Sequence, residues 1–109
     1  MTDKELLELA AKAAGIMHKW HDEIMVATFN DGIGWLEWNP LTDDGDALRL
    51  AVKLGLCVTI DMGLGHETEA WGYNEMAGKV IQDHNNDPYA ATRRAIVRAA
   101  VEVGRNYVP

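Results

Sequence analysis

The residues with the most evident chemical potential are the four histidines, two of which stand close together. His18 and His21 lie three residues apart and are followed by Asp22 and Glu23. On a helix this spacing would turn both imidazoles toward one metal ion, with a neighbouring carboxylate as a third ligand. On a strand the two rings would point to opposite faces. Because the segment lies between Gly15, which favours a helix end, and an apolar strand, we expect extended or irregular backbone and no metal or other cofactor.

The other two histidines, His66 and His84, are candidates for general acid–base chemistry. His66 precedes Glu67 in a glycine-rich loop, and His84 lies close in sequence to Asp83 and Asp87. If the fold brought the two segments together, an imidazole and a carboxylate could share proton transfer to a substrate. No nucleophile motif accompanies them, and the chain contains no serine.

The signals for covalent or phosphate chemistry are weak. The single cysteine, Cys57, alternates onto the polar side of an expected strand with Thr59 and Asp61, where no base would activate its thiol. The Gly63-Leu64-Gly65 turn lacks the residues that complete a phosphate-binding loop. We therefore expect a protein that is not an enzyme. A small metal-dependent enzyme that uses the paired histidines and nearby carboxylates stays as an alternative.

The charges are distributed unevenly along the chain, whose formal net charge is −7. Residues 1–92 carry 6 basic and 16 acidic side chains, whereas residues 93–109 carry 4 basic and 1 acidic. This balance disfavours a nucleic-acid partner, since such binding depends on Lys and Arg that neutralise phosphates. It leaves open an acidic mimic of nucleic acid that blocks a host DNA-binding or defence protein. The layout of six acidic side chains would test this alternative: Asp43, Asp44, Asp46, Glu67, Glu69 and Glu75.

Four tryptophans are many for a chain of 109 residues. Packing in the core and between strands is the first explanation, but exposed aromatic side chains are also favoured anchors of protein interfaces. Arginines on the polar face of the C-terminal helix interrupt the acidic surface, and pairing with nearby acids is the simplest role for them. The candidate interaction surface comprises Trp20, Trp35, Trp38, Trp71, Arg94 and Arg98.

Length and composition predict one domain over residues 1–109. A chain of this size buries about two-thirds of its extended surface, and with 48% apolar residues it can form a core without disulfides. A single cysteine is typical of a reducing compartment, and the N-terminus shows no charged segment followed by an apolar run. There is no run of 18 apolar residues. We expect a cytoplasmic protein without a membrane partner.

Three helices are predicted from their start and stop signals. Thr2 and Glu5 form a capping box, acidic residues crowd the start of the second helix, and Asp87 with Pro88 begins the third. A glycine follows each helix and favours the left-handed conformation that ends it. The predicted helices cover residues 3–14, the segment from the Asp43–Asp46 cluster to Leu54, and residues 88–103, ended by Gly15, Gly55 and Gly104.

Apolar runs with turn signals between them predict the strands. Asn30-Asp31-Gly32 is a turn sequence typical of a hairpin, and it joins two such runs. A later alternation of apolar and polar residues predicts a strand whose buried face carries Leu56, Val58, Ile60 and Met62. The predicted strands cover residues 24–29, 33–38, 56–62, 68–73 and 79–82.

The order of these elements, αββαβββα, predicts an α+β fold. The first two strands are apolar on both faces, which favours helices on both sides of the sheet. We therefore expect an α-β-α sandwich in which three helices surround a mainly antiparallel sheet of four to five strands.

Two blocks of the sequence resemble a known family. Residues 38–55 contain Trp38-Asn39-Pro40-Leu41, and residues 87–100 contain Thr92-Arg93-Arg94-Ala95. Together with the opening helix, these blocks resemble small phage and prophage proteins grouped as the phage ABA sandwich domain family. The resemblance implies an α-β-α sandwich and a bacteriophage or prophage setting. It implies no reaction, catalytic residue or cofactor.

These features favour a phage or prophage accessory protein that binds protein in the cytoplasm of a bacterial host. The partner would be a host protein or a second copy of the chain, since a small domain with several strands cannot cover every strand edge. We expect a dimer that tightens as salt screens the acidic charge. The acidic mimic and the small metal-dependent enzyme are the alternatives.

Overall fold

The computed structural model describes residues 1–28, 34–72 and 78–106. Within these ranges the chain is an α+β protein with three helices, as predicted, but with six strands rather than four to five. The order is αβββαβββα, because the segment that contains His18 forms an additional strand. The elements are α1 (Asp3–Ala13), β1 (Met17–His21), β2 (Ile24–Thr28), β3 (Leu36–Glu37), α2 (Asp44–Leu54), β4 (Leu56–Asp61), β5 (Glu67–Gly72), β6 (Val80–Asp83) and α3 (Pro88–Asn106).

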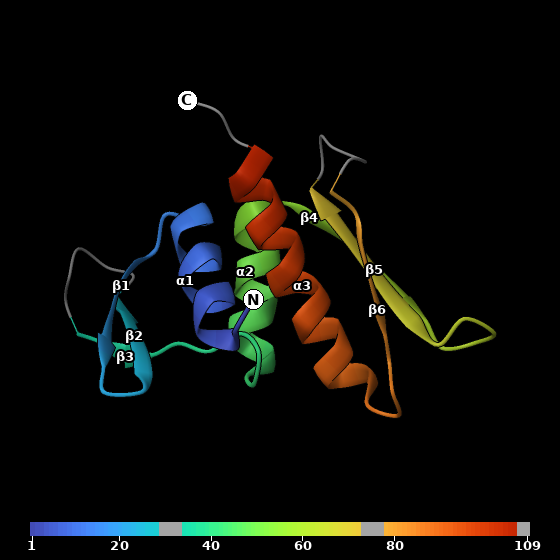
Figure 1. The fold of residues 1–109 in the computed structure, drawn as a ribbon, viewed down its shortest axis with the longest axis horizontal. Helices are drawn as coiled ribbons and strands as arrows, with labels where there is room; N and C mark the ends of the chain where they lie inside the picture. The colour runs from blue at the N-terminus through green and yellow to red at the C-terminus, as the bar shows by residue number, and fades with distance from the viewer. Residues whose placement is uncertain (29–33, 73–77, 107–109) are drawn as a thin grey trace.

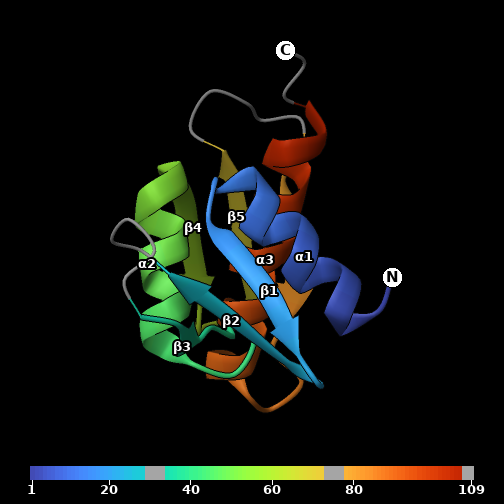
Figure 2. The ribbon, with the colours of Figure 1, turned by 90° about the vertical axis from the view of Figure 1, so that its left-hand side faces the viewer.

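The strands form two antiparallel sheets on opposite sides of the helices (Figure 1). Sheet A has the strand order β1-β2-β3, and sheet B has the order β4-β5-β6. Figure 2 shows sheet A in front of the helices and the strands of sheet B behind them. The expected layering, one sheet between helices, is therefore reversed, and the helices form the middle layer.

The burial pattern of β2 explains this reversal. We expected this strand to be apolar on both faces and hence covered on both sides. Met25 and Ala27 are indeed buried in the core, but on the other face Ile24 is exposed and Val26 only half-buried, with Thr28 buried at the end of the strand. A sheet with one buried face needs a covering layer on that side only. Each sheet therefore turns one face toward the shared helices and the other toward solvent.

Sheet A begins with a hairpin that we did not expect. β1 pairs with β2 across a turn at Asp22 and Glu23, and Asp22 has a φ of 57°. β2 also pairs antiparallel with β3, which confirms the predicted pairing of these two segments. The predicted turn at Asn30-Asp31-Gly32 lies outside the described residues.

The helix starts follow the predicted signals. The Thr2 hydroxyl accepts a hydrogen bond from the Glu5 N–H at 3.1 Å, and the Glu5 carboxylate accepts one from the Thr2 N–H at 3.1 Å. The side chains of Asp43 and Asp87 each accept a hydrogen bond from the backbone N–H three residues further on. Gly55, with a φ of 62°, ends α2 in the left-handed conformation.

Gly104 has a different role from the one we expected. It was predicted to end α3, but the helix continues to Asn106. A methyl group on Gly104 would lie 2.9 Å from the Ala13 Cβ, well inside the separation at which carbon atoms pack. The glycine therefore allows α3 to pack closely against α1.

The core has two parts. The larger lies between sheet A and the helices and includes the fully buried side chains of Trp38, Leu50 and Val97. The smaller lies between α3 and sheet B and consists of Ala70, Val80, Ala95 and Ala99. Its alanine side chains allow the helix to approach the sheet closely. In the described ranges no helix combines the length and apolar character needed to cross a membrane.

Candidate functional site

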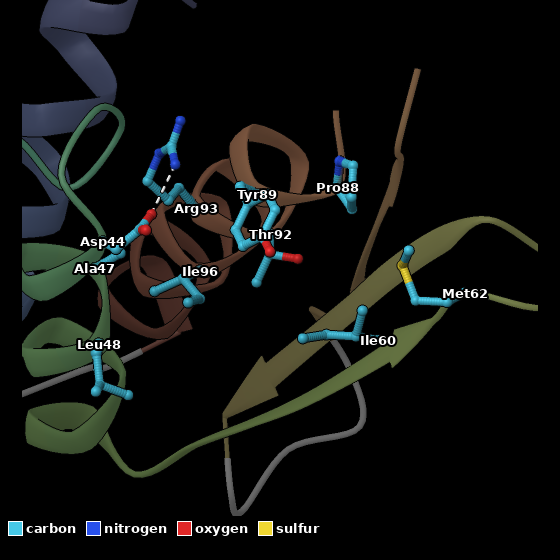
Figure 3. A pocket seen from close by; sticks show the side chains of 10 residues that line it. All are labelled: Asp44, Ala47, Leu48, Ile60, Met62, Pro88, Tyr89, Thr92, Arg93 and Ile96. Carbon is cyan, nitrogen blue, oxygen red and sulfur yellow. Dashed lines mark hydrogen bonds and ion pairs between the residues drawn. The ribbon is translucent and has the colours of Figure 1, made fainter. Parts of the chain in front are cut away.

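An open cleft of about 430 Å³ lies between α2, the start of α3 and the end of β4 (Figure 3). This volume falls within the range of natural binding pockets, and the lining is mostly apolar, as in such pockets. We call it the α2–α3–β4 cleft. Its lining residues are Asp44, Ala47, Leu48, Ile60, Met62, Pro88, Tyr89, Thr92, Arg93 and Ile96.

Two walls of the cleft face each other across an apolar space. Figure 3 shows Leu48 on one side and Ile60 and Met62 on the other, with Tyr89 and Ile96 between them. Of these five side chains only Ile96 is buried. The other four are exposed, so that the cleft is open to a partner rather than filled by the chain itself.

Two more exposed apolar side chains lie close in sequence to residues that line the cleft. Val52 lies one helical turn beyond Leu48 on α2, and Leu64 lies two residues beyond Met62 in the loop after β4. We call the following set the apolar face, with the exposed fraction of each side chain: Leu48 64%, Val52 73%, Ile60 52%, Met62 59%, Leu64 103% and Tyr89 71%.

Apolar spacing in the sequence predicts burial for most of the apolar face. Leu48, Val52, Ile60, Met62 and Tyr89 all recur with the period expected of buried positions, and the structure shows this expectation to be wrong. The sequence signal for these residues is that α2 has two apolar stripes. One stripe, which includes Leu50, is buried, and the other has no sheet or helix of the described chain over it.

The charged side chains that line the cleft are already paired. The Arg93 guanidinium lies 2.7 Å from an Asp44 carboxylate oxygen, and its Nε–H donates to the Leu41 carbonyl at 2.8 Å. These contacts join α3 to the start of α2 and to the preceding loop. The cleft therefore offers a neutral, apolar surface with one fixed ion pair at its border.

A chain of hydrogen bonds leads from the cleft into the interior. The hydroxyl oxygens of Thr92 and Thr68 lie 2.8 Å apart, and Thr68 Oγ1 lies 2.9 Å from His84 Nε2. Thr68 and His84 are buried. Because Thr68 separates the imidazole from Thr92, His84 cannot directly activate the hydroxyl that lines the cleft. The three side chains tie β5 to α3 and to the turn before it.

The two pairs of histidines considered as candidate sites do not act as pairs in the described structure. His18 and His21 lie three residues apart on a strand and so point to opposite faces. The His84 N–H donates to the His66 carbonyl at 2.9 Å, which brings the two backbones together, but the His84 ring contacts Thr68 instead. Within residues 1–28, 34–72 and 78–106, no three His, Cys, Asp or Glu side chains are grouped to hold a metal ion.

The four tryptophans of the candidate interaction surface lie in separate places. Trp38 is fully buried in the larger core, and Trp20 is partly buried against the same core. Trp35 and Trp71 each lie beneath a lysine ammonium group, 4.3 and 5.1 Å from the ring centroid. The structure does not bring the tryptophans together into one aromatic patch.

The two arginines of the same surface are held by the chain itself. Arg94 forms an ion pair of 2.8 Å with Asp3, which joins α3 to the start of α1. Arg98 donates to the Gln82 side chain at 2.9 Å and to the Ile81 carbonyl at 3.2 Å, which joins α3 to β6. The pairing of arginine with a nearby acid is thus confirmed for Arg94.

The acids at the start of α2 are used locally. Asp43 accepts a hydrogen bond from the Asp46 N–H, Asp46 accepts one from the Asn39 N–H, and Asp44 pairs with Arg93. These contacts hold the loop before α2 and the first turn of the helix. Glu75 lies outside the described residues.

The acids of sheet B form a short row. Glu67 on β5 lies opposite Asp61 on β4 and Asp83 on β6. All three belong to the face of the sheet that is turned away from α3, because Thr68 and Ala70 occupy the other face. Glu69, two residues further along β5, pairs with a lysine at 2.9 Å.

Comparisons with models of protein families, with curated proteins and with solved structures found no match to this chain.

Proposed function

We propose that this protein is a binding protein, not an enzyme, and that it acts through protein–protein contact at the apolar face. One observation carries the proposal: six large apolar side chains on and beside a single cleft are each more than half exposed. Monomeric proteins rarely expose contiguous apolar patches beyond a few hundred Å², and larger patches mark interaction sites. Tyr89 adds the type of side chain that anchors many interfaces.

The electrostatics of the cleft support this proposal. Burying an unpaired charge at an interface is costly. The charged side chains that line the cleft, Asp44 and Arg93, neutralise each other at 2.7 Å. A partner can therefore cover the apolar face without stripping water from an isolated charge, even though the chain as a whole carries −7.

The biological setting belongs to the same proposal. The resemblance of residues 38–55 and 87–100 to the phage ABA sandwich domain family supports a phage or prophage accessory protein. Such a protein works in the cytoplasm of a bacterial host, and the single cysteine fits a reducing compartment. The partner is then a second copy of the chain or a host protein.

One observation favours a second candidate, an acidic mimic of nucleic acid. Asp61, Glu67 and Asp83 lie side by side across sheet B, where neighbouring strands are about 4.8 Å apart. The row is short, and two N–H groups of the following loop already donate to Asp61. It therefore supports mimicry less than the apolar face supports protein binding. The small metal-dependent enzyme has no comparable support among the described residues.

A capture experiment tests the proposed function. Tagged wild-type protein is compared with Leu48→Lys and with Leu36→Lys, a matched control because Leu36 is 68% exposed but lies on β3, away from the cleft. The bait is offered to untagged copies of the chain and to bacterial host lysate. We expect binding that Leu48→Lys abolishes and Leu36→Lys preserves. Binding that Leu48→Lys leaves unchanged, or no binding to either source, would refute the proposal.

A further inference from the structure

We infer that the apolar face is closed by a second copy of the chain, with β4 of one copy pairing antiparallel with β4 of the other. Sheet B then becomes a continuous six-stranded sheet. The inference rests on the proposed function, because it names the partner of the same surface. It commits to a second copy rather than a host protein, and three features of the structure support it.

The first feature is the free edge of β4. In sheet B, β4 pairs with β5 on one side, and no described strand pairs with its other side. Proteins commonly protect such edges with proline, bulges or inward-pointing charges. β4 has none of these: its residues, Leu-Cys-Val-Thr-Ile-Asp, pair one to one with β5 from Leu56 to Asp61 without a bulge. Its outer edge is therefore available for a further strand.

The second feature is the position of α2 relative to this edge. Figure 2 shows α2 beside β4 at the border of sheet B, and α3 packs across the neighbouring β5. Leu48 and Val52 on α2 are exposed because the sheet ends before it reaches them. A strand added to β4 would extend the sheet beneath α2. It would cover these two side chains in the way that β5 covers α3.

The third feature is that the apolar face complements itself. If the helices of both copies lie on one side of the joined sheet, opposite residues must belong to the same face. A two-fold axis at Thr59 meets this condition and sets Val58 opposite Ile60 of the partner subunit. It also sets Met62 opposite the partner's Leu56 and carries Leu64 toward the partner's α2. The apolar residues on the helix-facing side of β4, and Met62 just after it, then lie opposite apolar residues of the partner subunit.

The area available fits a stable dimer. A standard interface buries about 800 Å² on each partner. The six side chains of the apolar face, at roughly 100 Å² or more of exposed surface each, are of this order before any backbone is counted. Two-fold pairing uses the same surface twice, as in most homodimers.

The charges near the axis do not oppose this pairing. Asp61 would lie opposite Cys57 of the partner subunit, so that the two Asp61 carboxylates stand at opposite ends of the paired strands. The remaining repulsion comes from the net charge of −7 on each copy. Salt screens repulsion between such distant charges, so association should strengthen as ionic strength rises.

Disulfide trapping tests this arrangement. Thr59→Cys is made in a Cys57→Ser background, since two cysteines opposite each other in an antiparallel pair are close enough to form a disulfide. Ile81→Cys in the same background is the control, because Ile81 is exposed on β6 at the opposite edge of sheet B. We expect mild oxidation to give a covalent dimer with Thr59→Cys and not with Ile81→Cys.

Two results would overturn the inference. One is a Thr59→Cys protein that stays monomeric under oxidation at high micromolar concentration and moderate salt. The other is equal cross-linking of both variants, which would indicate random collision. The two proposals can fail separately. If Thr59→Cys does not cross-link, the inference of a dimer fails. If wild-type protein still captures a host protein and Leu48→Lys does not capture it, the proposed function stands. Circular dichroism of each variant checks that the exposed substitutions leave the fold intact.

Discussion

The Thr68 hydroxyl lies 2.9 Å from Nε2 of the buried His84, and this contact fixes β5 to the turn that begins α3. Thr68 also reaches Thr92 at 2.8 Å, so that one hydroxyl joins three elements. A buried polar atom that lacks a hydrogen-bond partner lowers the stability of the fold. The Thr68 hydroxyl is this partner for the buried His84 imidazole.

We therefore expect Thr68→Val, which keeps the shape of the side chain, to lower the free energy of unfolding by about 1–3 kcal/mol. Urea denaturation measures the change. Thr42→Val in the loop before α2 is the control, because Thr42 is exposed and lies outside β4 and the apolar face, and it should change stability by less than about 0.5 kcal/mol. Equal effects at the two positions would contradict the role of the hydrogen-bonded chain.

The close approach of Gly104 to Ala13 leads to a second prediction. Gly104→Ala favours the helix by about 1 kcal/mol through propensity, but it forces a methyl group to 2.9 Å from the Ala13 Cβ. Overpacking of this kind costs about 1–3 kcal/mol, so we expect a net loss of stability in thermal unfolding. Ala13→Gly in the same chain should relieve it. A stabilised Gly104→Ala protein would show that the helices separate easily.

The capping residues give a third prediction. Thr2→Ala and Asp87→Ala each remove a side-chain acceptor from a helix start, and each should lower the free energy of unfolding by about 1 kcal/mol. Chemical denaturation of the two single variants provides the values. A decrease in the free energy of unfolding of only a few tenths of a kcal/mol at both positions would mean that these caps contribute little to stability.

A fourth prediction concerns the pH dependence of the first cap. The Thr2 N–H, and after it the Thr2 hydroxyl, hold the pKa of Glu5 below its ordinary value. A carboxyl group with a lower pKa when folded adds stability above its unfolded pKa, about 4.3, and loses it as pH falls through the folded value. Thr2→Ala keeps the N–H and removes the hydroxyl, so the Glu5 pKa should rise in a carboxyl NMR titration. An unchanged pKa would contradict this assignment.

Local features of the fold could be predicted from sequence because single residues decide them. Thr2, Asp43 and Asp87 cap helices through their own side chains, and Gly55 ends a helix through its own backbone. Gly104 shows the limit of this reasoning, because the same residue type also permits close packing. Only the position of Ala13 on another helix distinguishes the two roles.

The layers and the site could not be predicted in this way. Apolar spacing identifies the faces of a helix or strand that favour burial, but not which of them the rest of the chain covers. Leu50 and Leu48 lie two residues apart on α2, and one is buried while the other is exposed. Leu50 faces the larger core beneath sheet A, whereas no described sheet or helix covers Leu48, and this difference is a property of the assembled fold.

The central claim is that the apolar face binds protein, and that a second copy closes it. Its most direct test is the mass of the protein by light scattering after size exclusion, at high micromolar concentration and increasing salt. We expect wild-type protein and Leu36→Lys to have about twice the chain mass of 12.1 kDa, with a dimeric fraction that increases as the salt concentration rises. We expect Leu48→Lys to remain at 12.1 kDa. Wild-type protein at 12.1 kDa throughout, or a dimer that Leu48→Lys leaves intact, would contradict the account.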